Sequence, residues 1–439
     1  MENITDDGVM VSLMKKFRFI LYGLICILVL ARDIGGIDTS RFLFIGIAAV
    51  ICILSECAEL LCLAAFVAPL HTGIPGTFIV LVVFLVYIFK KRWLNIRHEE
   101  IGAILIVLLL EMINGVRGDF SVIEYLRFAA YFLLVFLIIL DKGKYCDGER
   151  VSLYFLAGYV IALISIWGQM LGKYSFDQIL KLGIRFGDVD STGTAIQDTM
   201  RVSFNQNDLG FVCAIVAVLS LIFRKRQRNP LYYIIFIVSI LTCIMTMSRG
   251  AVLSLVIGLV LYFLFTSTNI KGTLRNILFA TVGITVMIYL VYTFIPTYFT
   301  GLIERFAGEN LLNGRDTIMM YYNEELMAHV GRLVFGVGLQ NYPEKYGYHM
   351  SAHNAIQETV IAWGVIGLFT IIFLFVRGIR TAKTLNATIL REQYIPLIIL
   401  IIGLQSGQGF SQYAHMLYFL VAYSALYMEA ENAGEVKNG

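Results

Sequence analysis

The chain has 439 residues, of which 58% are hydrophobic and only 15% are charged, with a mean hydropathy of +0.77. A soluble globular chain carries about 25% charged residues, so this composition excludes an ordinary soluble domain and indicates a polytopic membrane protein. The formal net charge of +3 is too small to favour nucleic-acid binding, and the basic residues form short clusters between apolar runs.

The seven cysteines show no pattern typical of a disulfide framework or a metal site. Six of them fall inside apolar runs, and Cys146 lies in a short charged loop. We therefore expect them to fill the core, and we expect no metal site.

The first apolar run begins at Phe17, directly after Lys15 and Lys16, and Asp33 follows it without a small-residue cleavage box. This pattern favours a retained span over a signal peptide and places the N-terminus on the cytoplasmic side.

Further apolar runs of about the length that crosses a bilayer follow along the chain. We expect spans centred at 17–31, 42–55, 58–70, 77–90, 101–116, 122–140, 151–171, 207–223, 231–247, 251–267, 277–296, 358–376, 394–410 and 414–428. The sequence thus predicts an all-α polytopic membrane protein with about 12 to 14 transmembrane helices. At "SECAEL" (55–60), Glu56 and Glu59 mark either a tight cytoplasmic hairpin or a broken helix that lines a cavity. The hairpin places the basic loops on the cytoplasmic side, as the positive-inside rule requires.

No internal repeat or soluble domain interrupts the chain, so we treat residues 1–439 as a single integral membrane domain. Two long loops are predicted on the outer side, at 172–205 and 296–357. Long loops in compact proteins are usually functional or disordered. The second loop is rich in apolar residues and contains the helix-like stretch "GRDTIMMYYNEELMAHVG", so we expect an ordered cap over an outward-facing cavity.

Arginines are unexpectedly frequent on the predicted outer side, and their planar fork of donors suits phosphate oxygens. They are Arg185, Arg201, Arg249, Arg305, Arg315 and Arg332. A phosphorylated substrate is one interpretation; solvated or paired surface residues are the other, and we favour the latter for Arg305 and Arg332. Arg249 lies in the short turn "MSRG" between two spans, where a charge is costly unless it lines a polar cavity. For Arg315 the two interpretations are equally balanced.

The stretch "SAHNAIQE" (351–358) predicts the start of a helix with Ser351 as N-cap. His353 would then lie in the first turn, and Glu358 would lie one turn beyond Asn354. A histidine near an acidic partner is suited to act as a general base or proton relay. The alternative is an interfacial histidine that is hydrated by water.

Two other short motifs have both a structural and a functional interpretation. Gly336, in "GVGLQNY", either forms a tight turn or contacts substrate. In "NQND" (205–208), Asn205 or Asn207 caps the following span, or Asn207 contacts a sugar. The set Glu111, Glu124 and Arg127 is interpreted as a structural ion-pair network inside the membrane.

The order of "FNQNDLG" (204–210), "MSRGA" (247–251), "NGRDTIM" (313–319), "VFGVGLQNY" (334–342) and "HNAIQETVIAWGVIGL" (353–368) resembles the O-antigen ligase and O-antigen polymerase superfamily of bacterial surface-polysaccharide enzymes. The resemblance covers residues 200–375. It implies a GT-C type glycosyltransferase in the bacterial cytoplasmic membrane that faces outward and acts on glycans carried by undecaprenyl diphosphate. It also implies no cofactor, no nucleotide sugar and no required metal.

By position, the resemblance implies that Arg249 and Arg315 hold the donor diphosphate and that His353 assists the incoming hydroxyl. These three are the expected catalytic residues, and the reaction is expected to proceed with inversion. Residues expected to bind substrate are Arg201, Asn207, Gly336, Asn354 and Glu358.

Three functions remain open. The favoured one is a polymerase for capsule, exopolysaccharide or O-antigen, whose donor and acceptor are both lipid-linked glycans. The second is a ligase that transfers a finished chain to lipid A core or protein. The third is a lipid-linked oligosaccharide flippase, but this fold class predicts internal repeats that the sequence lacks. A flippase and a chain-length regulator are expected partners, together with the bilayer, and no nucleic acid is expected.

Overall fold

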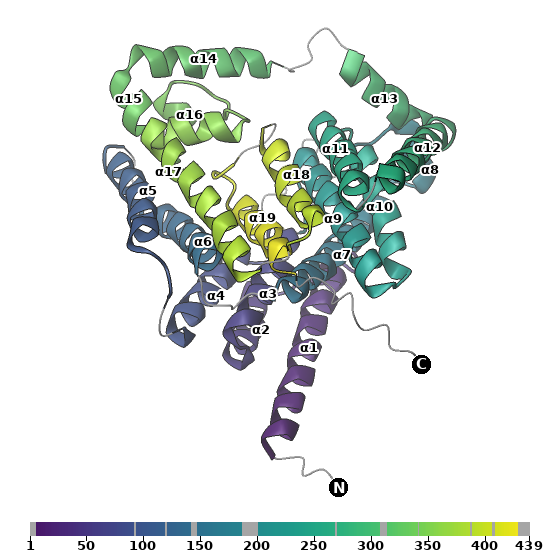
Figure 1. Ribbon diagram of the computed structural model, residues 1–439, viewed down its shortest axis with the longest axis horizontal. Helices are drawn as coiled ribbons and strands as arrows, with labels where there is room; N and C mark the ends of the chain where they lie inside the picture. Colours follow the sequence, from purple (N-terminus) through teal and green to yellow (C-terminus); the bar gives the residue numbers. More distant parts are fainter. Residues whose placement is uncertain are drawn as a thin grey trace. The chain divides into compact units, whose positions relative to one another are not determined.

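The computed structural model describes residues 6–91, 94–118, 121–141, 147–186, 201–267, 270–307, 314–340, 342–386, 389–405 and 409–428. These residues form nineteen α-helices and no β-strand (Figure 1). Each of the fourteen predicted apolar segments contains a helix. The chain is an all-α polytopic membrane protein, as its composition predicts.

Five helices in the described part are long and apolar enough to cross a membrane: Val122–Leu140, Gly148–Lys173, Gln206–Gln227, Lys271–Phe294 and Ala355–Leu385. Six shorter apolar helices accompany them, among them Leu231–Met245 and Arg249–Phe265. The membrane side of each loop stays a prediction from the basic residues.

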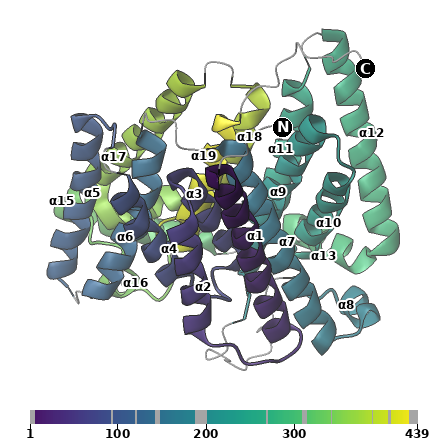
Figure 2. The same cartoon turned by 90° about the horizontal axis from the view of Figure 1, so that it is seen from below.

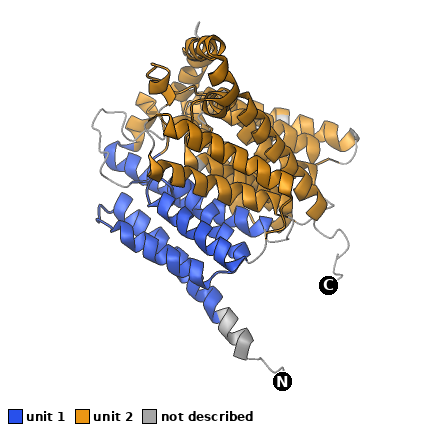
Figure 3. Cartoon of the chain, turned by 90° about the vertical axis from the view of Figure 1, so that its left-hand side faces the viewer, with its two compact units in different colours: residues 1–93, 145–175, 189–203 blue, residues 94–144, 176–188, 204–439 orange. Residues whose placement is uncertain are grey.

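The chain forms two compact units, shown in different colours in Figure 3. Unit 1 comprises residues 1–93, 145–175 and 189–203. Its helices are α1 (Asp6–Asp33), α2 (Arg41–Leu54), α3 (Cys57–Val67), α4 (Gly76–Lys90) and α7 (Gly148–Lys173), with a 3₁₀ turn at Ala68–Leu70. Helix α1 packs against α2 and α7 (Figure 2).

The stretch "SECAEL" separates α2 from α3 in unit 1. The ammonium group of Lys90, at the end of α4, donates hydrogen bonds to the carbonyls of Cys52 and Ile53 at the end of α2, at 2.9 and 2.8 Å. Because α4 packs against both α2 and α3, the arrangement favours the hairpin over a broken helix. Glu59 pairs with Arg18 of α1 and accepts a bond from the Glu56 amide, so its carboxylate has a structural role.

Unit 2 comprises residues 94–144, 176–188 and 204–439 and holds the predicted catalytic residues. Its helices are α5 (His98–Val116), α6 (Val122–Leu140), α8 (Phe176–Leu182), α9 (Gln206–Gln227), α10 (Leu231–Met245), α11 (Arg249–Phe265), α12 (Ile270–Phe294), α13 (Pro296–Ala307), α14 (Arg315–Ala328), α15 (Val330–Phe335), α16 (Tyr342–Lys345), α17 (Ala355–Leu385), α18 (Ile395–Leu404) and α19 (Tyr413–Ser424). The 3₁₀ turns Arg391–Tyr394 and Ala425–Tyr427 precede α18 and follow α19.

Helix α9 forms the centre of unit 2. Its sequence is apolar on all faces, as expected for a fully surrounded helix, and 83% of its apolar window is buried. It packs against α10, α11 and α18. The N-terminal ends of α9 and α11 thereby lie next to each other, since the Ser248 hydroxyl donates to the Asn207 side chain at 2.9 Å.

The segment 296–357 contains α13 to α16, and the predicted helix-like stretch is confirmed as α14. A cluster of tyrosines packs its second half together. Tyr322, fully buried, has its ring centroid 5.4 to 5.9 Å from those of Tyr342, Tyr346 and Tyr348. The Tyr322 hydroxyl donates to the carbonyl of Met350 at 2.7 Å. This packing gives α14 a fixed place relative to the start of α17.

Helix α17 is interrupted at Gly364, whose φ is +67°. The segment after α15 pairs with this break: the amides of Val337 and Gly338 donate to the carbonyls of Ile361 and Ala362 at 2.9 and 2.8 Å. Gly336 also has a positive φ of +73°, and a Cβ on it would overlap the backbone of Ala362. Gly336 therefore has the tight-turn role that one interpretation gave it, while its predicted contact with substrate stays a prediction.

Replacing Gly336 by alanine should destabilise unit 2 by roughly 1–3 kcal/mol, since it adds both backbone strain and an overlap. Thermal unfolding of the purified protein in detergent would measure the effect. Gly331→Ala is the matched control, because nothing lies within 4 Å of a Cβ built there. Equal melting temperatures for the two variants would contradict the packing described.

The polar set of α5 and α6 divides into two parts. Arg127 and Glu124 form the predicted i, i+3 ion pair at 2.9 Å. Glu111 belongs elsewhere, because its carboxylate accepts bonds from the Leu339 amide at 2.9 Å and the Trp363 indole at 2.8 Å. It thereby joins α5 to the break in α17.

Candidate functional site

Arg249 is the first residue of α11, and local capping fixes it there. The Ser248 side chain is the N-cap and accepts a bond from the Ala251 amide at 3.4 Å. Met247 before it has a left-handed φ of +50°, which ends the previous helix and turns the chain. The short turn predicted between two apolar segments is confirmed, and it points Arg249 toward α13.

Arg249 and Arg305 are joined reciprocally. The Arg249 guanidinium donates to the Arg305 carbonyl at 2.6 Å, and the Arg305 guanidinium donates to the Met247 carbonyl at 3.0 Å. Burial, and then the charge of Arg249, lower the pKa of Arg305. Of the favoured interpretations of Arg305, a solvated or a paired residue, the structure supports the paired one, because α13 holds its half-buried side chain against the α10–α11 turn.

Arg315 is the third cation of this cluster. It is the first residue of α14, after Gly314 with a φ of +76°. Burial, and then the charge of Arg249, lower the pKa of Arg315 as well. The guanidinium groups of Arg305 and Arg315 thus both experience the positive charge of Arg249.

Within the described residues, no carboxylate lies within ion-pair distance of Arg249, Arg305 or Arg315. Half-buried like charges repel each other unless an anion screens them. The cluster is therefore suited to hold a phosphate or diphosphate.

His353 lies beside this cluster, immediately before α17. Asn354, and not Ser351, is the N-cap of α17: its side chain accepts a bond from the Gln357 amide at 3.0 Å. The predicted cap and first-turn position of His353 are therefore wrong. His353 stands outside the helix with a left-handed φ of +51°, a conformation that non-glycine residues rarely adopt outside functional sites.

The electrostatic surroundings of His353 favour its neutral form. Burial lowers its pKa first, and the charge of Arg315 lowers it further, while Asp208 raises it. An imidazole that is neutral at neutral pH has a free nitrogen that accepts a proton. Asp208, in the first turn of α9, also lies 3.2 Å from His415 of α19. Asp208, and not Glu358 as the sequence suggested, is therefore the acidic neighbour of His353.

Glu358 is fully buried, and its carboxylate accepts bonds from the amides of Gly409, Phe410 and Ser411. It holds the segment before α19 against the start of α17. The structure therefore contradicts its assignment as the partner of His353, and this enclosure leaves no oxygen for a substrate. The side chain of Asn354 is also bonded to backbone at both ends: its oxygen accepts from the Gln357 amide, and its NH₂ group donates to the Gln405 carbonyl at 3.3 Å.

The other predicted residues are divided between the units. Asn205 is the N-cap of α9, as one interpretation held, and its side chain accepts from the Asn207 amide at 2.9 Å. Asn207 lies next to the Arg249 turn through Ser248. Arg332 pairs with Glu325 at 3.3 Å, as expected for a paired surface residue. Arg201 belongs to unit 1, so its predicted substrate contact stays a prediction.

A family model described as O-Antigen ligase matches residues 234–372. Residues 234–372 are thus similar to O-antigen ligases. The resemblance to the O-antigen ligase and polymerase superfamily is thereby confirmed over about a third of the chain. No curated protein and no solved structure matches the chain.

The matched region contains the three arginines of the cluster and His353. The match supports an O-antigen ligase- or polymerase-type activity in general terms. Asn207 and Asp208 lie before the matched region in sequence, and α9 brings them to it. The matched region also includes α13. No spacing in the sequence indicates that Arg305 of α13 lies at the "MSRG" turn.

Proposed function

We propose that the chain is a surface-polysaccharide polymerase that transfers a glycan from undecaprenyl diphosphate to a lipid-linked repeat unit on the outer side of the bacterial cytoplasmic membrane. The observation that carries this proposal is the cluster of Arg249, Arg305 and Arg315, without a described carboxylate partner, beside a neutral His353. A diphosphate leaving group needs such a cationic site, because charge develops on it as the glycosidic bond breaks.

In the proposed reaction, a hydroxyl oxygen of the acceptor attacks the anomeric carbon of the donor sugar. The bond between that carbon and the phosphate oxygen breaks, and its electron pair leaves with undecaprenyl diphosphate. The neutral imidazole of His353 takes the hydroxyl proton. A single displacement of this kind inverts the anomeric configuration, and the arginines supply the electrostatic stabilisation.

An apolar cavity of about 580 Å³ supports a polyprenyl donor. Helices α10, α11 and α12 line it, and Ile240, Phe263 and Val286 are typical of its side chains. It extends to Ile295, directly before α13, which carries Arg305. A lipid tail in this cavity would therefore have its headgroup close to the arginine cluster.

The alternative is a ligase that transfers a finished chain to lipid A core or protein. Its chemistry toward the donor is the same, so the arginine cluster and His353 serve both reactions. The two functions differ in the acceptor.

A deletion strain complemented with wild type or His353→Ala, at matched protein levels, separates them. The surface glycan is analysed by length, and the lipid-linked pool is analysed in parallel. The polymerase proposal predicts loss of long glycan and accumulation of single lipid-linked repeat units in the variant. Long chains that remain lipid-linked would indicate the ligase, and unchanged glycan would contradict both.

A further inference from the structure

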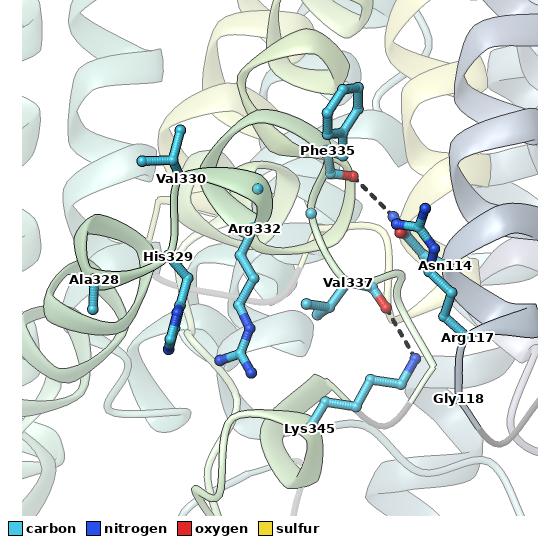
Figure 4. Close-up of a pocket in the computed structure, with 12 residues that line it drawn as sticks. Asn114, Arg117, Gly118, Ala328, His329, Val330, Arg332, Phe335, Val337 and Lys345 are labelled. Carbon is cyan, nitrogen blue, oxygen red and sulfur yellow. Dashed lines mark hydrogen bonds between the residues drawn. The ribbon is translucent and has the colours of Figure 1, made fainter.

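A second basic cavity lies in unit 2, apart from the arginine cluster. It has a volume of about 710 Å³ and is formed by the end of α5, the junction of α14 and α15, and α16 (Figure 4). Arg117, His329, Arg332 and Lys345 line it, and none of the described residues that line it is acidic. The cavity is therefore electropositive and large enough for a diphosphate with an attached sugar.

The cavity is built on fixed backbone. The Asn114 side chain donates to the Phe335 carbonyl at 2.8 Å, which fastens α5 to the end of α15. Lys345 donates to the Val337 carbonyl at 2.9 Å, as drawn in Figure 4. Gly118 permits this position of the lysine, because a Cβ on Gly118 would lie 2.9 Å from the Lys345 Cε.

The four basic side chains differ in how they are held. Arg332 forms an ion pair with Glu325, and its guanidinium group lies 5.0 Å from the centroid of the Tyr346 ring, so two contacts hold its side chain in place. Arg117 is exposed, and no hydrogen bond or ion pair holds its side chain to the described residues. Arg332 would therefore be in place before an anion binds, and the side chain of Arg117 could then turn toward the bound anion.

Exposed apolar side chains lie among and next to the residues that line the cavity. Val330 is 70% exposed, Phe335 is 47% exposed, and Val116 at the end of α5 is 68% exposed. The basic loops predict that this end of α5 faces outward, at the level of the lipid headgroups. Cations beside exposed apolar side chains at that level suit the anionic headgroup of a membrane-embedded amphiphile.

Helix α14 connects this cavity to the arginine cluster. Arg315 begins α14, and His329 directly follows its last residue. At 1.5 Å per residue, its fourteen residues separate the two basic sites by about 20 Å. Figure 1 shows α14 as one uninterrupted helix. An extended oligosaccharide of a few sugars spans such a distance.

We propose that this second cavity holds the diphosphate of the lipid-linked acceptor, and that α14 sets its distance from the reacting sugar. In the acceptor, the diphosphate is at one end of the repeat unit and the attacking hydroxyl is at the other. With the diphosphate at Arg117 and Lys345, the hydroxyl reaches His353. This inference rests on the proposed polymerase function, and it gives the physical reason why the acceptor is lipid-linked.

Counting bound ligands tests this inference without requiring turnover. The purified protein in nanodiscs of neutral phospholipid is titrated with undecaprenyl diphosphate, and native mass spectrometry counts the molecules bound. Wild type should bind two. The double variant Arg117→Gln, Lys345→Gln should bind one, as should Arg249→Gln, Arg315→Gln, and a protein with all four changes should bind none.

The affinity of the second cavity should fall roughly a hundredfold in its double variant, since each lost charge-assisted hydrogen bond weakens binding by roughly tenfold. Lys181→Gln is the control, because Lys181 is an exposed lysine of unit 2 outside both sites. Lys345→Arg should retain binding, which separates loss of charge from misfolding. A single bound molecule in wild type, or one displaced from the cavity by equimolar phosphatidylglycerol, would overturn the proposal.

Transfer kinetics separate this inference from the proposed function. The Arg117→Gln, Lys345→Gln variant should raise the KM for the lipid-linked acceptor and leave kcat unchanged. Its difference from wild type should vanish with a free oligosaccharide acceptor that lacks the diphosphate. Two bound molecules without any transfer would contradict the polymerase and support the cavity. Transfer with an unaltered acceptor KM in this variant would contradict the cavity and support the polymerase.

Discussion

Arg249→Ala should lower kcat/KM for transfer from the lipid-linked donor by about a hundred- to a thousandfold, the usual effect of removing one donor that stabilises developing charge. Arg249 is central, because both Arg305 and Arg315 lie in its electrostatic field and it donates to the Arg305 carbonyl. Its loss removes one charge and also releases α13. Initial rates with purified protein and lipid-linked repeat unit measure this effect.

Two further variants show which property of Arg249 matters. Arg249→Lys keeps the charge but loses the planar fork, so its rate should be intermediate. The double variant Arg249→Ala, Arg315→Ala should lose less than the product of the single effects, because both residues act on the same diphosphate. Arg275→Ala is the control, since Arg275 is an exposed arginine of α12 outside the site. Equal rates for Arg249→Ala and Arg275→Ala would remove Arg249 from the site.

His353→Ala should lower kcat by about a hundred- to ten-thousandfold, the range that general base catalysis contributes. The KM for the donor should change little, because the arginines and the apolar cavity hold that substrate. The variant should fold normally, since Asn354 and not His353 caps α17. A large rise in KM with an unchanged kcat would contradict the proposed role.

The pH dependence tests His353 independently of its removal. A base must be neutral, so activity should be full above the pKa of His353 and fall as pH drops through it. Burial and Arg315 place this pKa below the ordinary value of about 6.5. Removing a neighbouring positive charge raises the pKa, so Arg315→Gln should move the acid limb of kcat to higher pH.

Asp208→Asn should have the opposite effect, because the Asp208 carboxylate raises the pKa of His353. Removing that carboxylate should move the acid limb to lower pH. Rate profiles of the two variants beside wild type measure both shifts. An acid limb that stays in place in both variants would show that a different group titrates.

The parts of the fold and site that the sequence predicts are those encoded locally. Apolar run length predicts a helix in each of the fourteen segments, and Asn205 and the "MSRG" turn follow from capping and charge in adjacent residues. The order of the motifs predicts Arg249, Arg315 and His353 as site residues. In the structure, the charges of Arg315 and Asp208 both shift the pKa of His353.

The missed features depend on contacts between distant segments. Nothing near Arg305 in sequence indicates that α13 brings it to the Met247 carbonyl. Glu358 has the spacing of a partner for the "HN" motif, but the amides of residues 409–411 surround it. Gly336 is expected in a tight turn or in contact with substrate, but nothing nearby in sequence indicates that it packs against the break in α17 near Gly364. The N-cap of α17 is Asn354 and not the predicted Ser351, because serine and asparagine both favour this position and tertiary packing decides between them.

The most direct test of the account is transfer by the purified protein alone, reconstituted in vesicles with lipid-linked repeat unit. The length of the lipid-linked glycan and the release of undecaprenyl diphosphate are followed together. A polymerase should lengthen the glycan and release one undecaprenyl diphosphate for each bond formed, and the His353→Ala variant should do neither. Glycan that stays at one repeat unit in wild type, or lengthening without release of diphosphate, would contradict the proposed polymerase function.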